Sequence, residues 1–233
     1  METEARIAAI HEETPTIKSF LLDLMGQNFP FYPGQYVDLV LETPSSYETG
    51  GYYITSSPRL QGFIQLAVRK LPNRAVSVYL HERSQIGDEV FVMGPAGDFY
   101  FEAGMADSIV LIAGGIGITS LVSMLRYVHE AGLEVPVTLF YSARTPSELL
   151  FHKELADISN NNPKIKCLFT VTRPGDEPWD GRVGRIDSDL LREHVTDKNA
   201  MVYLNGPRGM PEDMAVMLTS MGVDPSRLNV EQW

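Results

Sequence analysis

The sequence contains a single cysteine, Cys167, among its 233 residues. One thiol cannot form an internal disulfide, and it cannot hold an iron–sulfur cluster, which needs several thiolates. The sequence also lacks any run of about 18 apolar residues that would span a bilayer. Its first residues, METEARIAAIHEE, are too acidic for a signal peptide. These absences predict a soluble, cytoplasmic protein without membrane insertion.

Positive charge is scarce in this chain. Lysine and arginine together number 19, against 30 aspartates and glutamates, and the formal net charge is −11. Such a chain repels nucleic acid backbones and anionic membrane surfaces, so neither is an expected partner. The five histidines share no spacing typical of a metal site, and we expect no metal.

The first part of the chain consists of short apolar runs separated by turn residues. Runs rich in β-branched and aromatic residues at close intervals are typical of an antiparallel barrel or sandwich. We expect strands at 5–13, 17–24, 35–42, 62–70 and 89–95, and a helix at 75–84. An all-β domain spanning 1–103 is therefore predicted.

Beyond residue 104, apolar strands alternate with amphipathic helices. This alternation predicts βαβ units and a doubly wound parallel sheet covered on both faces. The expected strands are 108–115, 135–144, 164–173 and 199–207, and the expected helices are 119–132, 146–159, 187–195 and 210–222. A second domain with an α/β fold is therefore predicted to span 104–233.

Three glycines, Gly114, Gly115 and Gly117, lie where the first strand of the second domain turns into a helix. Glycine allows a pyrophosphate to approach the backbone, and the helix N-terminus supplies free amides and a partial positive charge. Ser120 stands where the strict GxGxxG spacing has its third glycine. The loop indicates dinucleotide binding, with simple backbone packing as the alternative.

The next two strands of the second domain end without the acidic residue that usually binds the adenosine ribose. They end instead in hydroxyls and arginines, at Ser142, Arg144, Thr172 and Arg173. The arginines either face the adenosine phosphates, a 2′-phosphate included, or lie on the surface paired with acidic neighbours. NADPH and NADH therefore both stay open as hydride donors.

Five motifs occur in an order that resembles the ferredoxin–NADP reductase family of flavoproteins: YYITSSP, GPAGDF, IAGGIGIT, NGPRGM and a terminal EQW. The resemblance covers nearly the whole chain. It implies a six-stranded antiparallel barrel that binds FAD, with FMN as the alternative, followed by a domain that binds the nicotinamide dinucleotide. The nicotinamide would meet the flavin in the cleft between the two domains.

The resemblance also implies roles for individual residues. Tyr52 would stack on the isoalloxazine. Other flavin contacts would come from Tyr53, Ile54, Thr55, Ala67, Val68 and Arg69, with the amides of Ala75, Val76 and Ser77 at the pyrophosphate. The nicotinamide would be placed by Gly117, Thr119, Asn205, Gly206 and Met210. Glu231 would lie near the reactive edge of the flavin, and Trp233 would cover the flavin face. The predicted catalytic residues are therefore Glu231, Trp233, Thr119 and Asn205.

Three departures from the family pattern stand out. The pattern Arg-x-Tyr-Ser reads Gly50-Gly51-Tyr52-Tyr53, so a phosphate-binding arginine and a serine hydroxyl near flavin N5 are absent. The Gly-x-x-Ser pattern before the barrel helix begins with Arg74. We interpret Arg74 as a replacement cation, with a plain surface arginine as the alternative. Asn205 stands where the family usually has a cysteine beside the nicotinamide.

Together these features predict a flavoprotein reductase that transfers hydride from NAD(P)H to bound FAD and then passes electrons to a separate acceptor. A separate acceptor is expected because the cysteines for a fused iron–sulfur domain are missing. It would be a ferredoxin, a flavodoxin or an oxygenase component. One alternative is a flavin reductase that releases reduced free flavin, and another is a non-catalytic redox subunit of the same fold.

Overall fold

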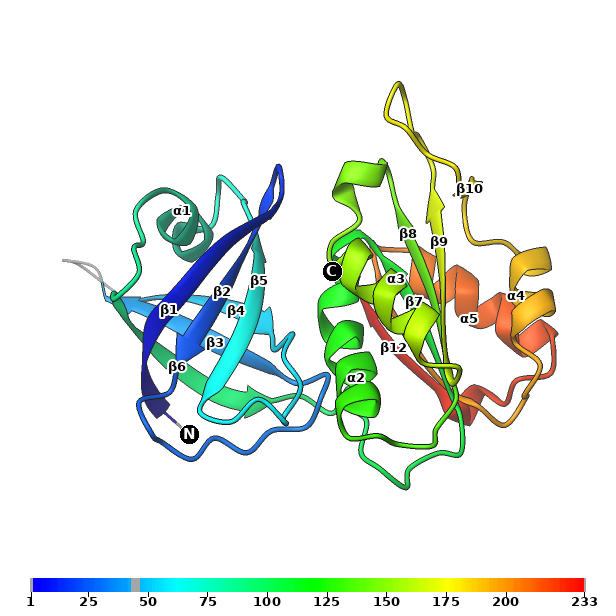
Figure 1. Cartoon of the computed structure of the whole chain (residues 1–233), viewed down its shortest axis with the longest axis horizontal. Helices are drawn as coiled ribbons and strands as arrows, with labels where there is room; N and C mark the ends of the chain where they lie inside the picture. Colours follow the sequence, from blue (N-terminus) through cyan, green and yellow to red (C-terminus); the bar gives the residue numbers. More distant parts are fainter. Residues whose placement is uncertain (1, 43–46, 233) are drawn as a thin grey trace.

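The computed structural model describes residues 2–42 and 47–232, which form two sheets (Figure 1). The first sheet has six antiparallel strands, and the second has six parallel strands with helices on both faces. The predicted fold class, a β-barrel followed by an α/β domain, is confirmed. We place the domain boundary near residue 104, in the connection between the two sheets.

The first sheet has the strand order β4-β3-β6-β1-β2-β5. A bridge between Ile54, just after β4, and Leu66 of β5 brings the two outer strands together into a barrel. The barrel core contains inward-facing residues such as Phe20, Leu22 and Leu39. Its elements are β1 Glu2–Thr14, β2 Ile17–Asp23, β3 Tyr36–Glu42, β4 Tyr47–Tyr53, β5 Phe63–Arg69, α1 Ala75–Glu82 and β6 Glu89–Ala96.

The second sheet has the order β10-β9-β8-β7-β11-β12. Its strands are β7 Ile109–Gly114, β8 Val137–Ala143, β9 Ile165–Val171, β10 Arg182–Val183, β11 Met201–Gly206 and β12 Leu228–Gln232. The helices are α2 Ile118–Glu130, α3 His152–Asn161, α4 Ser188–His194 and α5 Met210–Ser220, with short 3₁₀ turns at Gly115–Gly117, Pro146–Glu148 and Pro225–Arg227. Central strand β7 is buried on both faces, because Leu111 packs in the cluster of α2 and α3 while Ile112 packs in that of α4 and α5.

The structure differs from the sequence prediction in four elements. The segment of β4 is not among the apolar runs above, because two glycines weaken its strand signal, yet it pairs with β3 along its length. The helix expected at 146–159 begins only at His152, because Phe151 has a φ of 60°, which a helix cannot continue. Strands β10 and β12 were not expected from the sequence either.

Two findings concern the described residues as a whole. No helix within residues 2–42 and 47–232 is long and apolar enough to cross a membrane. The same residues contain no group of three or more His, Cys, Asp and Glu side chains that could hold a metal ion.

Candidate active site

The carboxyl ends of β11 and β12 bring two predicted site residues side by side. In the parallel ladder Asn205 is in register with Glu231 on one side and with Ala113 of β7 on the other. Residues in register on neighbouring strands project from the same face of a sheet. Asn205 and Glu231 therefore project together from the face that carries α2.

A hydrogen bond between Tyr53 and Glu231 joins the barrel to this edge of the second sheet. The Tyr53 hydroxyl donates to Oε2 of Glu231, and its ring packs edge-on against Tyr36 with centroids 6.3 Å apart. Burial raises the pKa of the Glu231 carboxyl above its ordinary value. Tyr53, which stands where the family pattern has a serine, therefore brings a hydroxyl to the carboxyl edge of the second sheet.

The side chain of Asn205 is buried next to the glycine loop. Its Nδ2 donates to Ser120 Oγ at 3.0 Å, and Ser120 Oγ donates to the carbonyl of Gly117 at 3.3 Å. Its Oδ1 is buried and has no hydrogen-bond partner among the described residues. Buried acceptors are nearly always satisfied. This oxygen therefore fits a donor that arrives with a ligand, such as the carboxamide N–H of a nicotinamide.

The glycine loop approaches β11 too closely for side chains. A Cβ on Gly117 would lie 2.3 Å from the carbonyl oxygen of Asn205. The loop is closed by Thr119, whose hydroxyl donates to the carbonyl of Ile116 at 2.8 Å. Among the described residues no side chain caps the N-terminus of α2. The Ile118 amide already donates to the carbonyls of Gly115 and Ile116, and the 3₁₀ turn that it closes, Gly115–Gly117, has no side-chain cap in the described chain either. An uncapped glycine turn at the start of a helix suits a phosphate.

Met210, the first residue of α5, packs against the same loop. Its sulfur would lie 2.4 Å from a Cβ on Gly114 and 2.9 Å from one on Gly206. A Cβ on Gly114 would also lie 2.7 Å from Cδ of Pro207, so packing favours glycine there, whereas at Gly206 a shift of the flexible Met210 side chain would relieve the contact. Packing and dinucleotide binding are compatible explanations of the loop, because the contacts of Met210 do not involve the N-terminus of α2.

Tyr52 folds back over Gly50 on β4. A Cβ on Gly50 would lie 2.8 Å from the Tyr52 hydroxyl oxygen, so a larger side chain does not fit there while Tyr52 holds this position. Burial raises the pKa of Tyr52 to about 12, and the nearby positive charge of Arg74 opposes that rise. The structure therefore brings the Arg74 cation close to the place from which the arginine of the family pattern is missing.

The N-terminus of α1 also has no side-chain cap within the described chain. Arg74 is the N-cap residue and has an extended backbone, with φ −123° and ψ 108°. Ser77 turns inward: its hydroxyl donates to the Arg69 carbonyl at 2.9 Å and accepts from the Leu71 amide at 2.7 Å. The amides of residues 75–77 are thus available to an anion, which fits the pyrophosphate of FAD.

Comparison with known proteins decides the family. The model of the oxidoreductase FAD-binding domain matches residues 5–101, and that of the oxidoreductase NAD-binding domain matches residues 111–215. Oxidoreductase NAD-binding domain-containing protein 1 of Homo sapiens is 34% identical over 252 residues, which cover 98% of this chain and 79% of that protein. The chain belongs to the ferredoxin–NADP reductase-like family. As a member of this family, it is an oxidoreductase that uses FAD and NAD(P)H.

Two further proteins of this reductase family are similar to the chain. The glycine betaine monooxygenase reductase subunit of Chromohalobacter salexigens is 35% identical over 209 residues, 88% of this chain and 56% of that protein. The chain therefore spans little more than half the length of this relative. The solved ferredoxin reductase in carbazole 1,9a-dioxygenase has a TM-score of 0.83 at 25% identity, covering 98% of this chain and 68% of that one.

Removal of the Arg74 cation is expected to weaken flavin retention. Arg74→Ala should lower FAD affinity by about 1.5–3 kcal/mol, the worth of a charge-assisted hydrogen bond. Titration of the apoprotein with FAD at low and high salt measures this, and the salt dependence should be smaller in the variant. Arg192→Ala is the control, because Arg192 is an exposed residue of α4 that pairs with Asp189. Equal FAD dissociation constants for wild type and Arg74→Ala would leave Arg74 as a surface arginine.

The predicted flavin residues of β5 lie in three different environments. Ala67 is buried in the cluster beneath α2, and Val68 is buried in the barrel core. These two can offer a flavin little beyond their backbone. Arg69 is half-buried near Glu148 and Arg144 of the second domain; burial lowers its pKa, and Glu148 opposes that change. Arg69 therefore lies on the side of the barrel that faces the second domain, and its contact with the flavin stays a prediction.

Arg144 and Arg173 emerge side by side from the carboxyl ends of β8 and β9. The Arg173 amide donates to the Arg144 carbonyl at 2.7 Å, and both residues are exposed. Just before them the Ser142 hydroxyl lies 3.2 Å from that of Thr170, and the Thr172 amide bonds to β8 at 3.0 Å. Two guanidinium groups at one sheet edge match an anionic phosphate, which keeps the predicted adenosine site in place as a proposal.

Trp233, predicted to cover the flavin face, lies outside the described residues. The residues before it are placed by the sheet, since Gln232 is in register with Gly206 and Glu231 with Asn205. The described end of the chain thus runs along the same carboxyl edge as the site. The role of Trp233 stays a prediction.

One charged residue at the domain interface was missed by the sequence analysis. Arg126 lies in α2 next to Leu125, one of the residues of the apolar face, and is only 8% exposed. An arginine inside a helix that is otherwise apolar from Leu121 to Val128, apart from Ser123, was the available signal. Its partners come from a distant part of the chain, which no local pattern shows.

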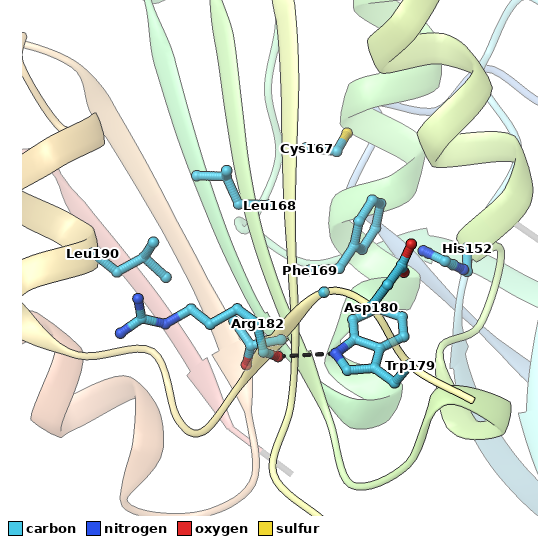
Figure 2. A pocket seen from close by; sticks show the side chains of 10 residues that line it. His152, Cys167, Leu168, Phe169, Trp179, Asp180, Arg182 and Leu190 are labelled. Atoms are coloured by element: carbon cyan, nitrogen blue, oxygen red, sulfur yellow. Dashed lines mark hydrogen bonds between the residues drawn. The ribbon is translucent and has the colours of Figure 1, made fainter. Parts of the chain in front are cut away.

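A cavity of about 340 Å³ opens at the edge of β9, beside the segment that carries Trp179 (Figure 2). His152 lies edge-to-face against Phe169 with ring centroids 4.5 Å apart, and the indole N–H of Trp179 donates to the Arg182 carbonyl at 3.1 Å. Burial raises the pKa of the Cys167 thiol to about 12, so thiolate chemistry is not expected there. None of the predicted site residues within the described chain lines this cavity.

Proposed function

We propose that this chain takes hydride from NAD(P)H onto FAD and delivers the electrons to a separate acceptor, such as a ferredoxin, a flavodoxin or an oxygenase component. Bound FAD accepts a hydride and releases its electrons singly, which a nicotinamide cannot do. The Tyr53–Glu231 hydrogen bond carries the proposal, because it joins the YYITSSP motif to the carboxyl edge of the second sheet. The relative that is the reductase subunit of a monooxygenase supports an acceptor of the oxygenase type.

In this proposal the residues of the chain bind and orient. Arg74 and the N-terminus of α1 neutralise the flavin pyrophosphate, and Tyr52 supplies an aromatic face. Oδ1 of Asn205 accepts an N–H from the nicotinamide carboxamide. Glu231, held by Tyr53, places a carboxyl at the reactive edge that can accept or donate a proton. Near-contact geometry between the two cofactors is the main contribution of the protein to catalysis.

Anaerobic mixing of the purified, flavin-loaded protein with NADH or NADPH tests the proposal. We expect the absorbance of oxidised flavin to be lost within seconds. Faster reduction by NADPH than by NADH would support contact of Arg144 or Arg173 with a 2′-phosphate, and substitution of the responsible arginine should remove that difference. If neither nicotinamide bleaches the flavin, the reductase proposal is wrong, and a non-catalytic redox subunit becomes the better reading.

A flavin reductase that releases its product is the second candidate. The observation in its favour is Gly50, where Tyr52 leaves no room for the phosphate-binding arginine of the family. Desalting after anaerobic reduction separates the two candidates. Reduced flavin that leaves the protein supports the flavin reductase, whereas flavin that stays bound supports electron delivery to another acceptor.

A further inference from the structure

One face of α2 is hydrogen-bonded to the barrel segment that follows Tyr53. Ser123 Oγ donates to the Ser56 carbonyl at 2.6 Å, and Arg126 Nη1 donates to the Thr55 carbonyl at 2.8 Å. Ser123 and Arg126 are three residues apart, so they lie on the same helix face. Two successive carbonyls of the barrel are therefore held by a single helix of the second domain.

The guanidinium of Arg126 is fixed from several sides. Its Nε and Nη2 form two bonds to the Glu154 carboxylate, each 2.7 Å long. Its Nη1 also donates to Gln65 Oε1 at 2.7 Å, and the guanidinium carbon lies 4.5 Å from the centroid of the Phe151 ring. The bidentate pair and these additional contacts together hold the planar guanidinium of Arg126 in a single orientation.

Gln65 ties Arg126 to the same barrel segment a second time. The Thr55 amide donates to the Gln65 carbonyl at 2.7 Å, and the Thr55 hydroxyl lies 3.1 Å from Gln65 Oε1. The Gln65 amide in turn donates to Ser56 Oγ at 3.0 Å. The backbone just after the two tyrosines therefore cannot move without breaking contacts to Arg126 or to its partner Gln65.

The other end of α2 is the glycine loop. The helix begins at Ile118, directly after Gly117, and Arg126 lies about 12 Å further along its axis. We propose that Arg126, held by Glu154, is a positioning residue for hydride transfer: it fixes the barrel segment that carries Tyr53 relative to the loop that approaches the nicotinamide. This inference rests on the proposed function. Arg126 contacts neither cofactor in it, but holds the Thr55 carbonyl of the barrel from α2 of the second domain.

Arg126→Met should misplace the two cofactors relative to each other. A displacement of about 1 Å can slow a reaction about 10²-fold, so we expect flavin reduction at saturating NAD(P)H to slow by about 10- to 100-fold. The dependence on NAD(P)H concentration should change little, because the contacts of the glycine loop are retained. Anaerobic stopped-flow measurements on the whole 233-residue chain loaded with FAD give both quantities. Arg126→Lys keeps the positive charge but cannot form the bidentate pair with Glu154, so its rate of flavin reduction should lie between those of wild type and Arg126→Met.

A control variant separates positioning from stability. Leu218→Ala removes a buried side chain of α5 on the opposite face of the second sheet. It should lower Tm without slowing flavin reduction. The circular dichroism of the oxidised flavin needs no turnover, and it should change in Arg126→Met but not in Leu218→Ala.

The positioning role of Arg126 and the proposed reductase function can fail separately. If Arg126→Met has a lowered Tm but a wild-type reduction rate and wild-type flavin dichroism, Arg126 is only structural and the inference is wrong. If the wild type itself is not reduced by either nicotinamide, the proposed function fails, and the inference fails with it. Should Arg126→Met not fold, Arg126→Lys carries the same comparison: a wild-type rate and dichroism there would overturn the inference.

Discussion

Flavin reduction by NAD(P)H is expected to slow by at least about 10²-fold when Glu231 is replaced by glutamine. The carboxyl of Glu231 is held by Tyr53 at the edge where the two domains meet. A side chain that holds or moves a proton at a reacting group contributes about 10²–10⁴-fold. Stopped-flow reduction of Glu231→Gln at saturating NAD(P)H measures the loss. The dissociation constants of flavin and dinucleotide should stay near the wild-type values, because glutamine has nearly the same shape.

The same carboxyl should make stability depend on pH. Burial raises the folded-state pKa of Glu231 above its unfolded value, so the fold favours the neutral form. Its contribution to the free energy of unfolding is fully present below the unfolded pKa, and it is lost as the pH rises through the raised folded pKa. As the pH increases from the unfolded pKa of Glu231 through its folded pKa, the Tm of wild type should therefore fall relative to that of Glu231→Gln. Tyr53→Phe removes a hydrogen-bond donor to the charged carboxylate and should raise the folded pKa of Glu231 further. In that variant the loss of stability should therefore extend to higher pH.

A Tm difference between wild type and Glu231→Gln that is the same at every pH would contradict this account. It would mean that the carboxyl has the same pKa in the folded and unfolded chains. A normal reduction rate in Glu231→Gln would separately remove Glu231 from the chemistry and leave it as a contact between the domains.

Alanine at Gly117 is expected to lower the free energy of unfolding by about 1–3 kcal/mol and to weaken dinucleotide binding strongly. Backbone conformation is not the reason, because a φ of −59° is accessible to any residue. The added Cβ would lie 2.3 Å from the carbonyl oxygen of Asn205 and 2.5 Å from its carbonyl carbon. Backbone atoms cannot rotate away, so either the loop or β11 must shift. A shift of β11 would also move the side chain of Asn205.

Gly104→Ala is the matched control for this substitution. Gly104 has a φ of +94°, and a Cβ there would meet no atom within 4 Å. Alanine at this position therefore suffers only conformational strain, about 1–2 kcal/mol, and should leave dinucleotide affinity unchanged. Urea denaturation and titration with oxidised dinucleotide compare the two variants. Wild-type dinucleotide affinity in Gly117→Ala would show that the close approach of the loop serves packing alone.

The second domain could be predicted from sequence because its signals are local. Every residue of β7 is buried, and the strand is apolar throughout, as expected for the centre of a parallel sheet. Leu121, Leu125 and Val128 recur at helical spacing, and all three are fully buried in α2. Such patterns identify an element without knowledge of the elements it contacts.

The missed features depend on contacts between distant parts of the chain. Residues around Gly50 form a strand because β3 pairs with them, which local β propensity does not show. The start of α3 is set by the left-handed backbone of Phe151, although the residues before it favour helix. Arg126 is buried because the carbonyl of Thr55, 71 residues earlier in the sequence, accepts from it.

In the candidate site, too, some features could be predicted from the sequence and others depend on contacts between distant parts of the chain. The order of the motifs indicated Asn205 and Glu231, and the register of β11 and β12 places them side by side. The hydroxyl that reaches Glu231 comes from Tyr53, 178 residues away. A comparison of motifs does not show this contact, because it compares residue types and not the positions of the atoms.

The cluster beneath α2 belongs to both domains, since Ile17 and Ala67 of the barrel pack there with Leu121 and Leu125. A barrel produced without the second domain would expose these two apolar side chains to water, and the carbonyls held by α2 would lose their donors. The boundary near residue 104 therefore separates the two sheets, but we do not expect the barrel to be stable when it is expressed without the second domain. A chimera that joins this barrel to the second half of a relative would have to keep the barrel-facing side of α2, Arg126 included.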